Sequence, residues 1–467
     1  MSKPSSSQQE VQNVLNLGKS IPETIIRLSI PAILEQLLIC MATLLDTAMV
    51  GSIGANATAS VAINASTVWL INGIITALSV GFSYLVSHAV GERSKEKTEL
   101  AVRQAITASV CLGLLLTLVL RLLHRNIPVW LGAEPDVVPN AGAYMGILAF
   151  GLLPQTLGVV LSAVLRSAGN TRLPLIANLT SNLLNVIGNF FLIYPSRQMV
   201  FAGVSVPVFG AGLGIRGAAI STAFSQFALA VLLLVFLFRA DTPARIAPKG
   251  SYRFRSQTLK SIVHISVPVL LERNTLCLGQ IALTAMISGL GTIPLAAHYL
   301  TNQTESLMYL PAYGFAYTAT TLIGQSLGAG NRQLAARFAK SICIISAIVI
   351  ELVCIPVFLL AKPIVSLLTT DAEVIRLGTQ TVQIAAATEL FFSFYIIISG
   401  IFRGAGDVKF PLVVSLVGMW GLRTGLVWLV TGPLALGVTG VWWAIGADCF
   451  IRFLLCLWRL KSGKWMK

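Results

Sequence analysis

The segment "RSAGNTRLPL" at residues 166–175 has a near copy, "RGAGDVKFPL", at residues 403–412, which lies 237 positions later. An arginine, an Ala-Gly pair, a second basic residue and Pro-Leu stand at the same places in both copies. The same offset relates "IPAILEQ" (30–36) to "VPVLLER" (267–273), and the register needs no gap from residue 30 to residue 174. The chain is therefore an internal duplication, and each copy of the quoted segment is the turn between the fourth and fifth helix of its half.

The composition places the duplication in a membrane. Hydrophobic residues make up 55% of the 467 positions and charged residues 11%, more apolar surface than a soluble core can hide. The long apolar runs suit helices, which need about 20 residues to cross roughly 30 Å of hydrocarbon, and the alternation typical of an outer-membrane barrel is absent. We expect an all-α integral membrane protein.

The apolar runs and the breaks between them predict twelve transmembrane helices. Their expected ranges are 24–49, 57–90, 101–123, 137–166, 172–194, 214–239, 259–289, 294–327, 335–361, 373–402, 410–431 and 437–459. An even number of helices in each half inserts both halves the same way up, so the repeat is parallel and its pseudo-twofold axis runs along the membrane normal.

These ranges divide the chain. We expect a polar tail at 1–20, a first lobe at 21–239, a linker at 240–258, a second lobe at 259–459 and a basic tail at 460–467. Beyond the fifth helix the offset falls to 223, because the first half carries 14 extra residues within "SRQMVFAGVSVPVFGAG".

The basic residues that give the net charge of +15 are concentrated in alternate loops. Lysine and arginine gather near 93–103, 239–260, 332–340 and 459–467, and the intervening loops near 50–57, 290–294 and 431–437 have none. This positive-inside bias predicts a plasma-membrane protein with both termini and the linker in the cytoplasm, and it argues against nucleic acid as a partner. We expect no cleaved signal peptide, and we interpret the seven cysteines as small core residues.

The pair "LRSAGNTRLPL" and "FRGAGDVKFPL", together with "LLDTAMVG" (44–51) and "LAAHYL" (295–300), resembles the multidrug and toxic compound extrusion (MATE) family. The resemblance spans about residues 20–460. It implies two six-helix lobes around a V-shaped cleft that opens to either side in turn. It also implies export of small organic cations in exchange for H⁺ or Na⁺, by a protein that needs no other cofactor. We expect a monomer surrounded by membrane lipid.

Asp46, in the outer half of the first helix, is the first candidate for the coupling cation. An ionised side chain at the bilayer centre costs roughly 2.5–3.5 kcal/mol on insertion scales, so acids in such a bundle are candidates for function. No basic residue lies near Asp46 in the sequence. A proton or a captured cation, Na⁺ included, is therefore the expected partner.

Four asparagines of the fifth helix form one stripe: Asn178, Asn182, Asn185 and Asn189. They could simply hold helices together by amide hydrogen bonds, or Asn185 and Asn189 could orient Asp46 and offer oxygen ligands to a hard cation. The resemblance favours the second interpretation for Asp46 and Asn185. We also assign Asn182, which belongs to the same stripe, to this cation site. It also implies an aspartate in many relatives where this chain has Asn189, and it places Thr222, or its neighbour Ser221, in the same site.

The second lobe departs from the sodium-coupled members of the family. Their acids on the seventh and tenth helices correspond to Leu276 and Phe392, so we do not transfer that sodium site. The acids that this chain does have could line a substrate cleft and attract a cation, and they are Glu35, Glu272, Glu305 and Glu389. Glu35 and Glu272 are related by the repeat, and a local pair of Glu272 with a basic group such as Arg273 is the alternative.

Four further charged residues have structural interpretations. We interpret Arg166 and Arg403 as parts of the two repeated turns, at helix ends where cations are favoured. Arg423 and Asp448 fall at similar depths in the last two helices, which predicts an intramembrane ion pair.

The leading hypothesis is a secondary antiporter, and the single matched acid favours a proton over sodium. A lipid-linked oligosaccharide flippase would need a cationic cavity, whereas acids outnumber Arg and Lys at mid-membrane depth here. A membrane-embedded enzyme would need a catalytic motif, and the sequence has no HExxH, GxSxG or P-loop.

Overall fold

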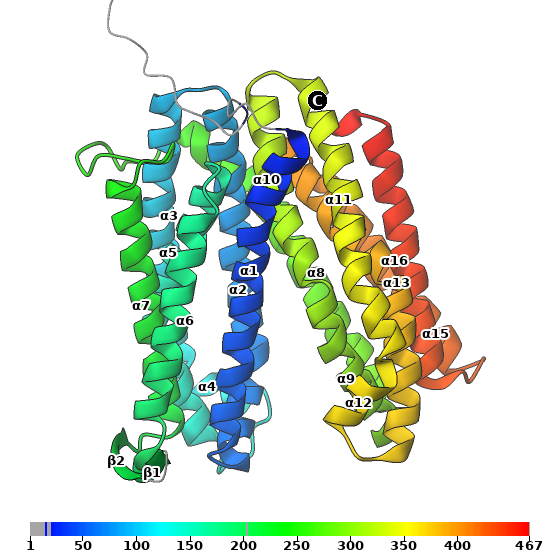
Figure 1. The fold of residues 1–467 in the computed structure, drawn as a ribbon. Coiled ribbons are helices and arrows are strands. Elements are labelled where there is room, and N and C mark those ends of the chain that lie inside the picture. The colour runs from blue at the N-terminus through cyan, green and yellow to red at the C-terminus, as the bar shows by residue number, and fades with distance from the viewer. Residues whose placement is uncertain (1–14, 16–19, 202–203, 467) are drawn as a thin grey trace, which may run out of the picture.

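The computed structural model describes residues 15, 20–201 and 204–466. Of the predicted polar tail, residues 1–14 and 16–19 lie outside this part, as do residues 202–203 of the predicted insertion and Lys467. The described residues are nearly all helical, and they form two lobes that stand side by side (Figure 1).

The first lobe contains six long helices and one short one. They are α1 (Ile21–Gly51), α2 (Ala55–Gly91), α3 (Lys95–Leu123), the short α4 (Asn126–Trp130), α5 (Val138–Ser167), α6 (Arg172–Leu192) and α7 (Ile215–Arg239). Its largest core cluster packs Phe82, Leu161 and Leu233 from three different helices.

The second lobe repeats this order with more interruptions. Its helices are α8 (Ser256–Ser288), α9 (Thr292–Met308), α10 (Leu310–Gly328), α11 (Arg332–Leu359), the short α12 (Ala361–Leu368), α13 (Ala372–Ala405), α14 (Lys409–Leu416), a π-helical turn (Val417–Arg423), α15 (Thr424–Thr431), α16 (Gly437–Lys461) and a 3₁₀ turn (Lys464–Met466). Phe315, Phe402 and Trp442 belong to a separate core.

The expected count of twelve membrane helices is not reproduced. Ten helices in the described part are long and apolar enough to cross a membrane. The segment predicted as one helix, 294–327, is two helices that meet at Tyr309 and Leu310, because Pro311 lacks the N–H that an unbroken helix would need. α8 is long enough, but it carries the adjacent charges Glu272 and Arg273 near its middle.

The two quoted turns close their helices in the same way. Gly169 follows α5 with a φ of 91°, and Gly406 follows α13 with a φ of 81°. A residue with a Cβ adopts this left-handed conformation only at a cost, so the glycine of each Ala-Gly pair is what lets the chain turn.

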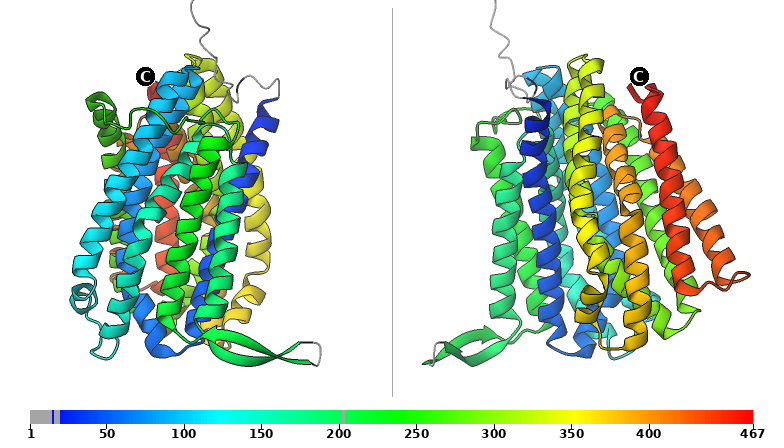
Figure 2. Two further views of the ribbon diagram at one scale, coloured as in Figure 1. Left: turned by 90° about the vertical axis from the view of Figure 1, so that its left-hand side faces the viewer. Right: turned by 45° about the vertical axis from the view of Figure 1, so that its right-hand side comes forward.

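Both lobes meet at the end of the bundle where α1 begins and α16 ends, and their helices diverge toward the other end (Figures 1 and 2). The C-terminal turns of α2 and α10 come into backbone contact there. A Cβ on Gly91 would lie 2.2 Å from the carbonyl oxygen of Gln325, and one on Gly328 would lie 2.3 Å from that of His88. Positions 88 and 91 correspond to 325 and 328 in the repeat, so the two contacts are reciprocal.

Side chains join the lobes beside this contact. His88 Nε2 donates to the carbonyl oxygen of Gly404 over 2.9 Å. Thr321 donates to the carbonyl oxygen of Arg166 over 3.1 Å, and Gln325 donates to that of Ser167 over 2.9 Å. The two repeated turns are thus fixed to the opposite lobe.

The 14-residue insertion forms the only β-strands among the described residues. Strands β1 (Pro195–Phe201) and β2 (Val204–Ala211) pair as an antiparallel hairpin in which Pro195 faces Ala211. The hairpin projects from the end of the bundle opposite the start of α1 and the end of α16 (Figure 2). Arg197 lies over the rings of Phe190 and Tyr194, at 4.5 and 4.4 Å from the ring centroids.

Removing residues 197–210 is expected to leave the first lobe folded. Ser196 would then bridge Pro195 and Ala211, which already face each other, and closing a shorter loop costs little entropy. We expect the melting temperature in detergent to stay within about 3 °C of the natural protein, as measured by fluorescence-detected gel filtration after heating. Aggregation of the shortened protein would show that the hairpin is needed for folding.

Substituting Gly328 by valine is expected to separate the lobes where the termini lie. The new side chain would overlap the His88 carbonyl, and overpacking of this kind costs about 1–3 kcal/mol. Spin labels at Glu96 and Gln333, both exposed, would report a longer and broader distance distribution in a cysteine-free background.

The matched control is Gly425→Val, because Gly425 is also helical but a Cβ there meets nothing within 4 Å. The control should leave the distribution unchanged. An unchanged distribution in Gly328→Val as well would refute the importance of the glycine contact.

Candidate functional site

Asp46 lies in a hydrogen-bonded cluster that joins three helices of the first lobe. Asn189 Nδ2, from α6, donates to Asp46 Oδ1 over 2.7 Å, and the same nitrogen lies 3.5 Å from Asn185 Oδ1. Asn185 Nδ2 in turn donates to Thr222 Oγ1 of α7 over 3.2 Å, and Ser221 Oγ donates to the Asn185 carbonyl over 2.7 Å. The structure therefore brings together four of the five residues predicted for the cation site, with Ser221 beside them.

The carboxyl group of Asp46 has no basic partner among the described residues. In the part of the chain that the structure describes, Asp46 forms no ion pair with lysine, arginine or histidine, and only an amide donates to it. Asn189 is fully buried, and its Oδ1 has no hydrogen-bond partner. A half-buried carboxylate with a single amide donor, beside a buried acceptor oxygen without a partner, leaves room for a proton or a cation.

The asparagine stripe divides between two sites. Asn178 Nδ2 donates to Glu35 Oε1 over 2.9 Å, so this residue serves a different carboxylate from Asp46. Asn182 Nδ2 is buried without a partner, and the structure does not bring Asn182 into the hydrogen-bonded cluster as we expected. Helical spacing places the four amides on one face of α6. That face extends along α1 past both Glu35 and Asp46, so amides at its two ends contact different carboxylates.

Glu35 and Glu272 are not the free cleft carboxylates that the sequence suggested. Glu35 Oε1 lies 2.7 Å from Arg166 Nη1, and both oxygens of Glu272 lie 3.0 Å from Arg403 Nη2. Both glutamates are 2% exposed. Since the repeat relates the two glutamates and the two arginines, the lobes contain equivalent buried ion pairs.

The same pairs correct the interpretation of the arginines as simple parts of a turn. Their backbone belongs to the turn, but their side chains reach back to neutralise the glutamates of α1 and α8. The partner of Glu272 is Arg403, supported by Tyr395 Oη, which donates to Glu272 Oε1 over 3.0 Å; Arg273 is not its partner.

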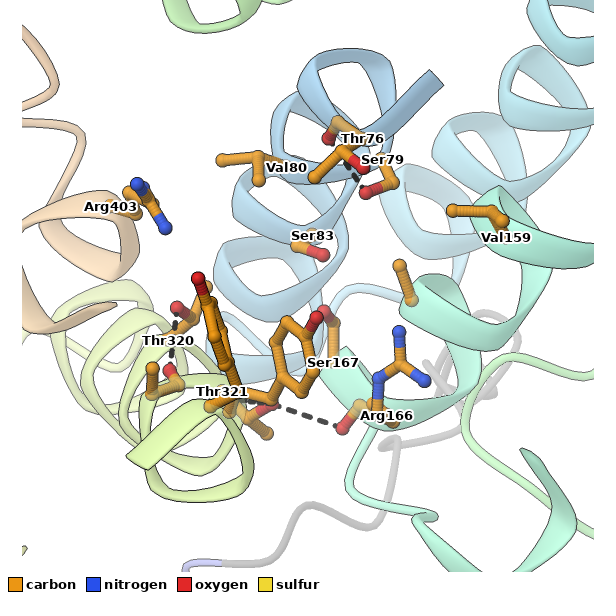
Figure 3. Close-up of a pocket in the computed structure, with 14 residues that line it drawn as sticks. Thr76, Ser79, Val80, Ser83, Val159, Arg166, Ser167, Thr320, Thr321 and Arg403 are labelled. Carbon is orange, nitrogen blue, oxygen red and sulfur yellow. Dashed lines mark hydrogen bonds between the residues drawn. The ribbon is translucent and has the colours of Figure 1, made fainter. Parts of the chain in front are cut away.

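A pocket lies between the lobes, with Arg166 on one side and Arg403 on the other (Figure 3). α2 lines it with Thr76, Ser79, Val80 and Ser83, and α10 lines it with Tyr313, Ala316, Tyr317, Thr320 and Thr321. The four residues of α2 are equivalent in the repeat to the first four of α10, each 237 positions later. The pocket therefore lies on the pseudo-twofold axis. The Arg166 guanidinium stands over the ring of Tyr317, at 4.7 Å from its centroid.

Sequence reasoning did not find this pocket. The available signal was the repeat itself, because residues that face each other across an axis stand at matching positions in the two halves. In this chain the signal was the presence of polar residues at positions 76, 79 and 83 of the first half and at the equivalent positions 313 and 320 of the second half.

The remaining candidates lie deeper in the second lobe. Arg423 Nε is 2.8 Å from Asp448 Oδ2, and Arg452 donates to both oxygens of Asp448 over 2.8 and 2.7 Å. Arg452 was missed, although its spacing of four residues from Asp448 on one helix could have indicated it. The π-helical turn places Gly418 where a Cβ would meet Arg452 Nε at 2.3 Å.

Glu305 and Glu389 do not line the interlobe pocket. Glu389 is 1% exposed and accepts from Ser393 Oγ over 2.8 Å, while its other oxygen has no partner. Among the described residues neither acid forms an ion pair. Glu305 of α9 and Glu389 of α13 thus resemble Asp46 of α1, which also has no ion-pair partner among the described residues.

Comparisons with known proteins agree with this architecture. The family model described as MatE matches residues 31–191 and 268–429. The chain is 26% identical to the probable multidrug resistance protein NorM of Thermotoga maritima, over 96% of this chain and 94% of that protein. It is 24% identical to multidrug and toxin extrusion protein 1 of Oryctolagus cuniculus, over 91% of this chain and 73% of that protein.

Solved structures share the fold. A MOP superfamily transporter from Pyrococcus furiosus, whose binding pocket is described as having reverse polarity, superimposes with a TM-score of 0.86 at 21% identity, over 98% of this chain and 99% of that one. An outward-facing MATE family multidrug resistance transporter gives a TM-score of 0.87 at the same identity and coverage.

The two stretches matched by the family model begin 237 positions apart, at 31 and 268, as the internal repeat requires. They cover most of each lobe and include Asp46, Asn185 and Asn189 of the cluster and the residues of both buried ion pairs. The chain is a multi-pass membrane transporter and belongs to the MatE family of multidrug efflux proteins.

Proposed function

We propose that the protein is a secondary antiporter of the plasma membrane, with both termini in the cytoplasm, that exports small organic cations in exchange for H⁺ or Na⁺ bound at Asp46. The observation that carries this proposal is the contrast among the carboxylates. Glu35, Glu272 and Asp448 are each held by arginine, whereas Asp46 is partly exposed and has only an amide donor. The negative charge of Asp46 is therefore available to a coupling ion.

A proton suits the geometry better than sodium. One carboxylate and two amides surround the position, and Asn189 can serve either charge state of Asp46. Its Nδ2 donates to the ionised carboxylate, and rotation of the amide would present its unpartnered Oδ1 to a protonated one. Sodium would instead need several oxygen ligands together, and Asn185 Oδ1 and Thr222 Oγ1 are already engaged with donors.

Coupling requires the ion and the substrate to favour different states of the protein. In the described state the lobes are joined at the end that carries the termini, so the diverging end faces outward in the proposed orientation. Binding of the ion at Asp46 would neutralise the cluster that links α1 to α6 and α7. We propose that this rearranges the first lobe and releases substrate to the outside.

The cationic group of the substrate is assigned to the unpaired acids Glu305 and Glu389. The paired acids Glu35 and Glu272 offer no free charge in this state. A flippase for lipid-linked oligosaccharide is disfavoured for a similar reason, because the guanidinium groups of Arg166 and Arg403 in the pocket are already neutralised. We propose that the protein acts as a monomer, since each lobe has its own core and the site lies within one chain.

Asp46→Asn is expected to abolish gradient-driven transport, because the substitution preserves shape and removes the titratable charge. Ethidium uptake into proteoliposomes under an imposed pH gradient or an imposed sodium gradient measures it. Uptake should fall at least tenfold to the background of empty vesicles, and the gradient that drives the natural protein identifies the ion.

The exchange variant Asp46→Asn with Asn189→Asp restores a carboxylate one hydrogen bond away and should regain part of the activity. Asn182→Ala is the control, because its side chain has no hydrogen bond to the cluster. Full activity of folded Asp46→Asn would refute the proposed coupling site. If neither gradient moves ethidium in the natural protein, the organic-cation antiport itself fails.

A further inference from the structure

α8 carries two adjacent charges that have different surroundings. Glu272 is buried and held by Arg403. Arg273, beside it, makes a single long hydrogen bond within the described residues, 3.5 Å from Nη1 to the hydroxyl of Tyr313. Its Nε is buried without an acceptor, and its guanidinium lies 5.6 Å from the centroid of the Tyr313 ring. A half-buried cation without a carboxylate partner is costly in a membrane protein.

The fold does not require this charge. The repeat gives a direct comparison, because the first lobe has Gln36 at the position of Arg273. The neighbouring pair Glu35 and Arg166 is kept as Glu272 and Arg403 in the second lobe. The ion pair is thus common to both lobes, and the extra cation is present in one.

The tyrosines beside Arg273 are also confined to one lobe. Tyr313 and Tyr317 of α10 correspond to Thr76 and Val80 of α2, and all four line the interlobe pocket. The pocket is therefore nearly symmetric in backbone but not in chemistry. One side has short side chains. The other has two aromatic rings, and the Arg273 guanidinium, which does not itself line the pocket, lies next to Tyr313.

The charges around the pocket sum to one positive unit. Arg166 cancels Glu35 and Arg403 cancels Glu272, which leaves Arg273. It lies at the contact between the lobes, since a Cβ on Gly73 of α2 would be 3.8 Å from its Cβ. Its partial exposure leaves the guanidinium within reach of a bound molecule.

We infer that Arg273 and Tyr313 form an anion subsite, which takes a single carboxylate carried on a flat aromatic ring system. A guanidinium presents two parallel N–H groups that match the two oxygens of a carboxylate, and such charge-assisted bonds are strong where water is scarce. One excess positive charge is balanced by one carboxylate. The rings of Tyr313 and Tyr317 would stack against the aromatic part.

This inference rests on the proposed export function and refines its substrate class. Aromatic zwitterions would be held at both ends, with the carboxylate at Arg273 and the cationic group at the acids of the second lobe. A cation without a carboxylate would bind only at the acids of the second lobe and would not contact Arg273.

The test compares three probes in the full-length protein: norfloxacin, which carries a carboxylate, its ethyl ester, which does not, and ethidium. Binding is measured in detergent by isothermal titration calorimetry, and transport is measured in proteoliposomes under the active gradient. The natural protein should bind norfloxacin at least tenfold more tightly than the ester. In Arg273→Gln this ratio should fall about tenfold, toward one.

Two further variants test whether the shape of the Arg273 side chain, in addition to its charge, causes the preference for the carboxylate. Arg273→Lys keeps the charge but loses the planar fork, so its ratio should lie between those of the natural protein and Arg273→Gln. Arg376→Gln removes an exposed arginine that pairs with Glu373, and it should keep the ratio of the natural protein.

The outcomes separate the two proposals. If the probes are transported but Arg273→Gln leaves the norfloxacin-to-ester ratio unchanged, the anion subsite is refuted and the antiport function stands. If no probe is transported under either gradient, the antiport function fails, while the binding ratio still decides the role of Arg273. Stronger competition by phenyl phosphate than by benzoate would overturn the assignment to a carboxylate.

Discussion

The arrangement of the lobes depends on a backbone contact that only glycine permits. Gly91 and Gly328 let α2 and α10 approach until each helix touches the carbonyl groups of the other. This approach brings the two repeated turns within reach of Thr321, Gln325 and His88 of the opposite lobe. The interlobe pocket, with an arginine from each turn, exists because the helices that line it are held this close.

Pairing sorts the charges inside the bundle into two groups. Glu35, Glu272 and Asp448 each have an arginine at 3.0 Å or less, so their charges hold helices together. Asp46, Glu305 and Glu389 have no such partner in the described part of the chain, and neither does Arg273. An unpaired charge inside a membrane is costly. A bound ion or substrate that compensates this cost is the best explanation for the unpaired groups.

Much of the architecture could be predicted from the sequence because it depends on repetition and hydropathy. The offset of 237 gave the two halves, the equivalent turns and the position of the insertion, and helical spacing placed Asn185 and Asn189 together. The hairpin form of the insertion and the break at Tyr309 could not be predicted in this way, because both are local backbone features within apolar or short segments.

The errors at the site have a single physical source. Glu35 and Arg166 are 131 residues apart, so each looked unpaired when its sequence neighbours alone were considered. The same limitation left Arg273 as a suspected partner of Glu272. Distance along the chain says little about pairing in a bundle, where every helix faces several others.

The reciprocal contacts at the lobe junction have a consequence for the origin of the chain. Position 91 touches 325 and position 328 touches 88, which is the pattern of an isologous interface between two identical copies. A single half could therefore have assembled as a parallel homodimer with its pocket on the twofold axis and a Glu–Arg pair in each subunit. In such a dimer any substitution changes both sides of the pocket. Within a single chain that restriction does not hold, and one side has Arg273 and two tyrosines where the other has Gln36, Thr76 and Val80.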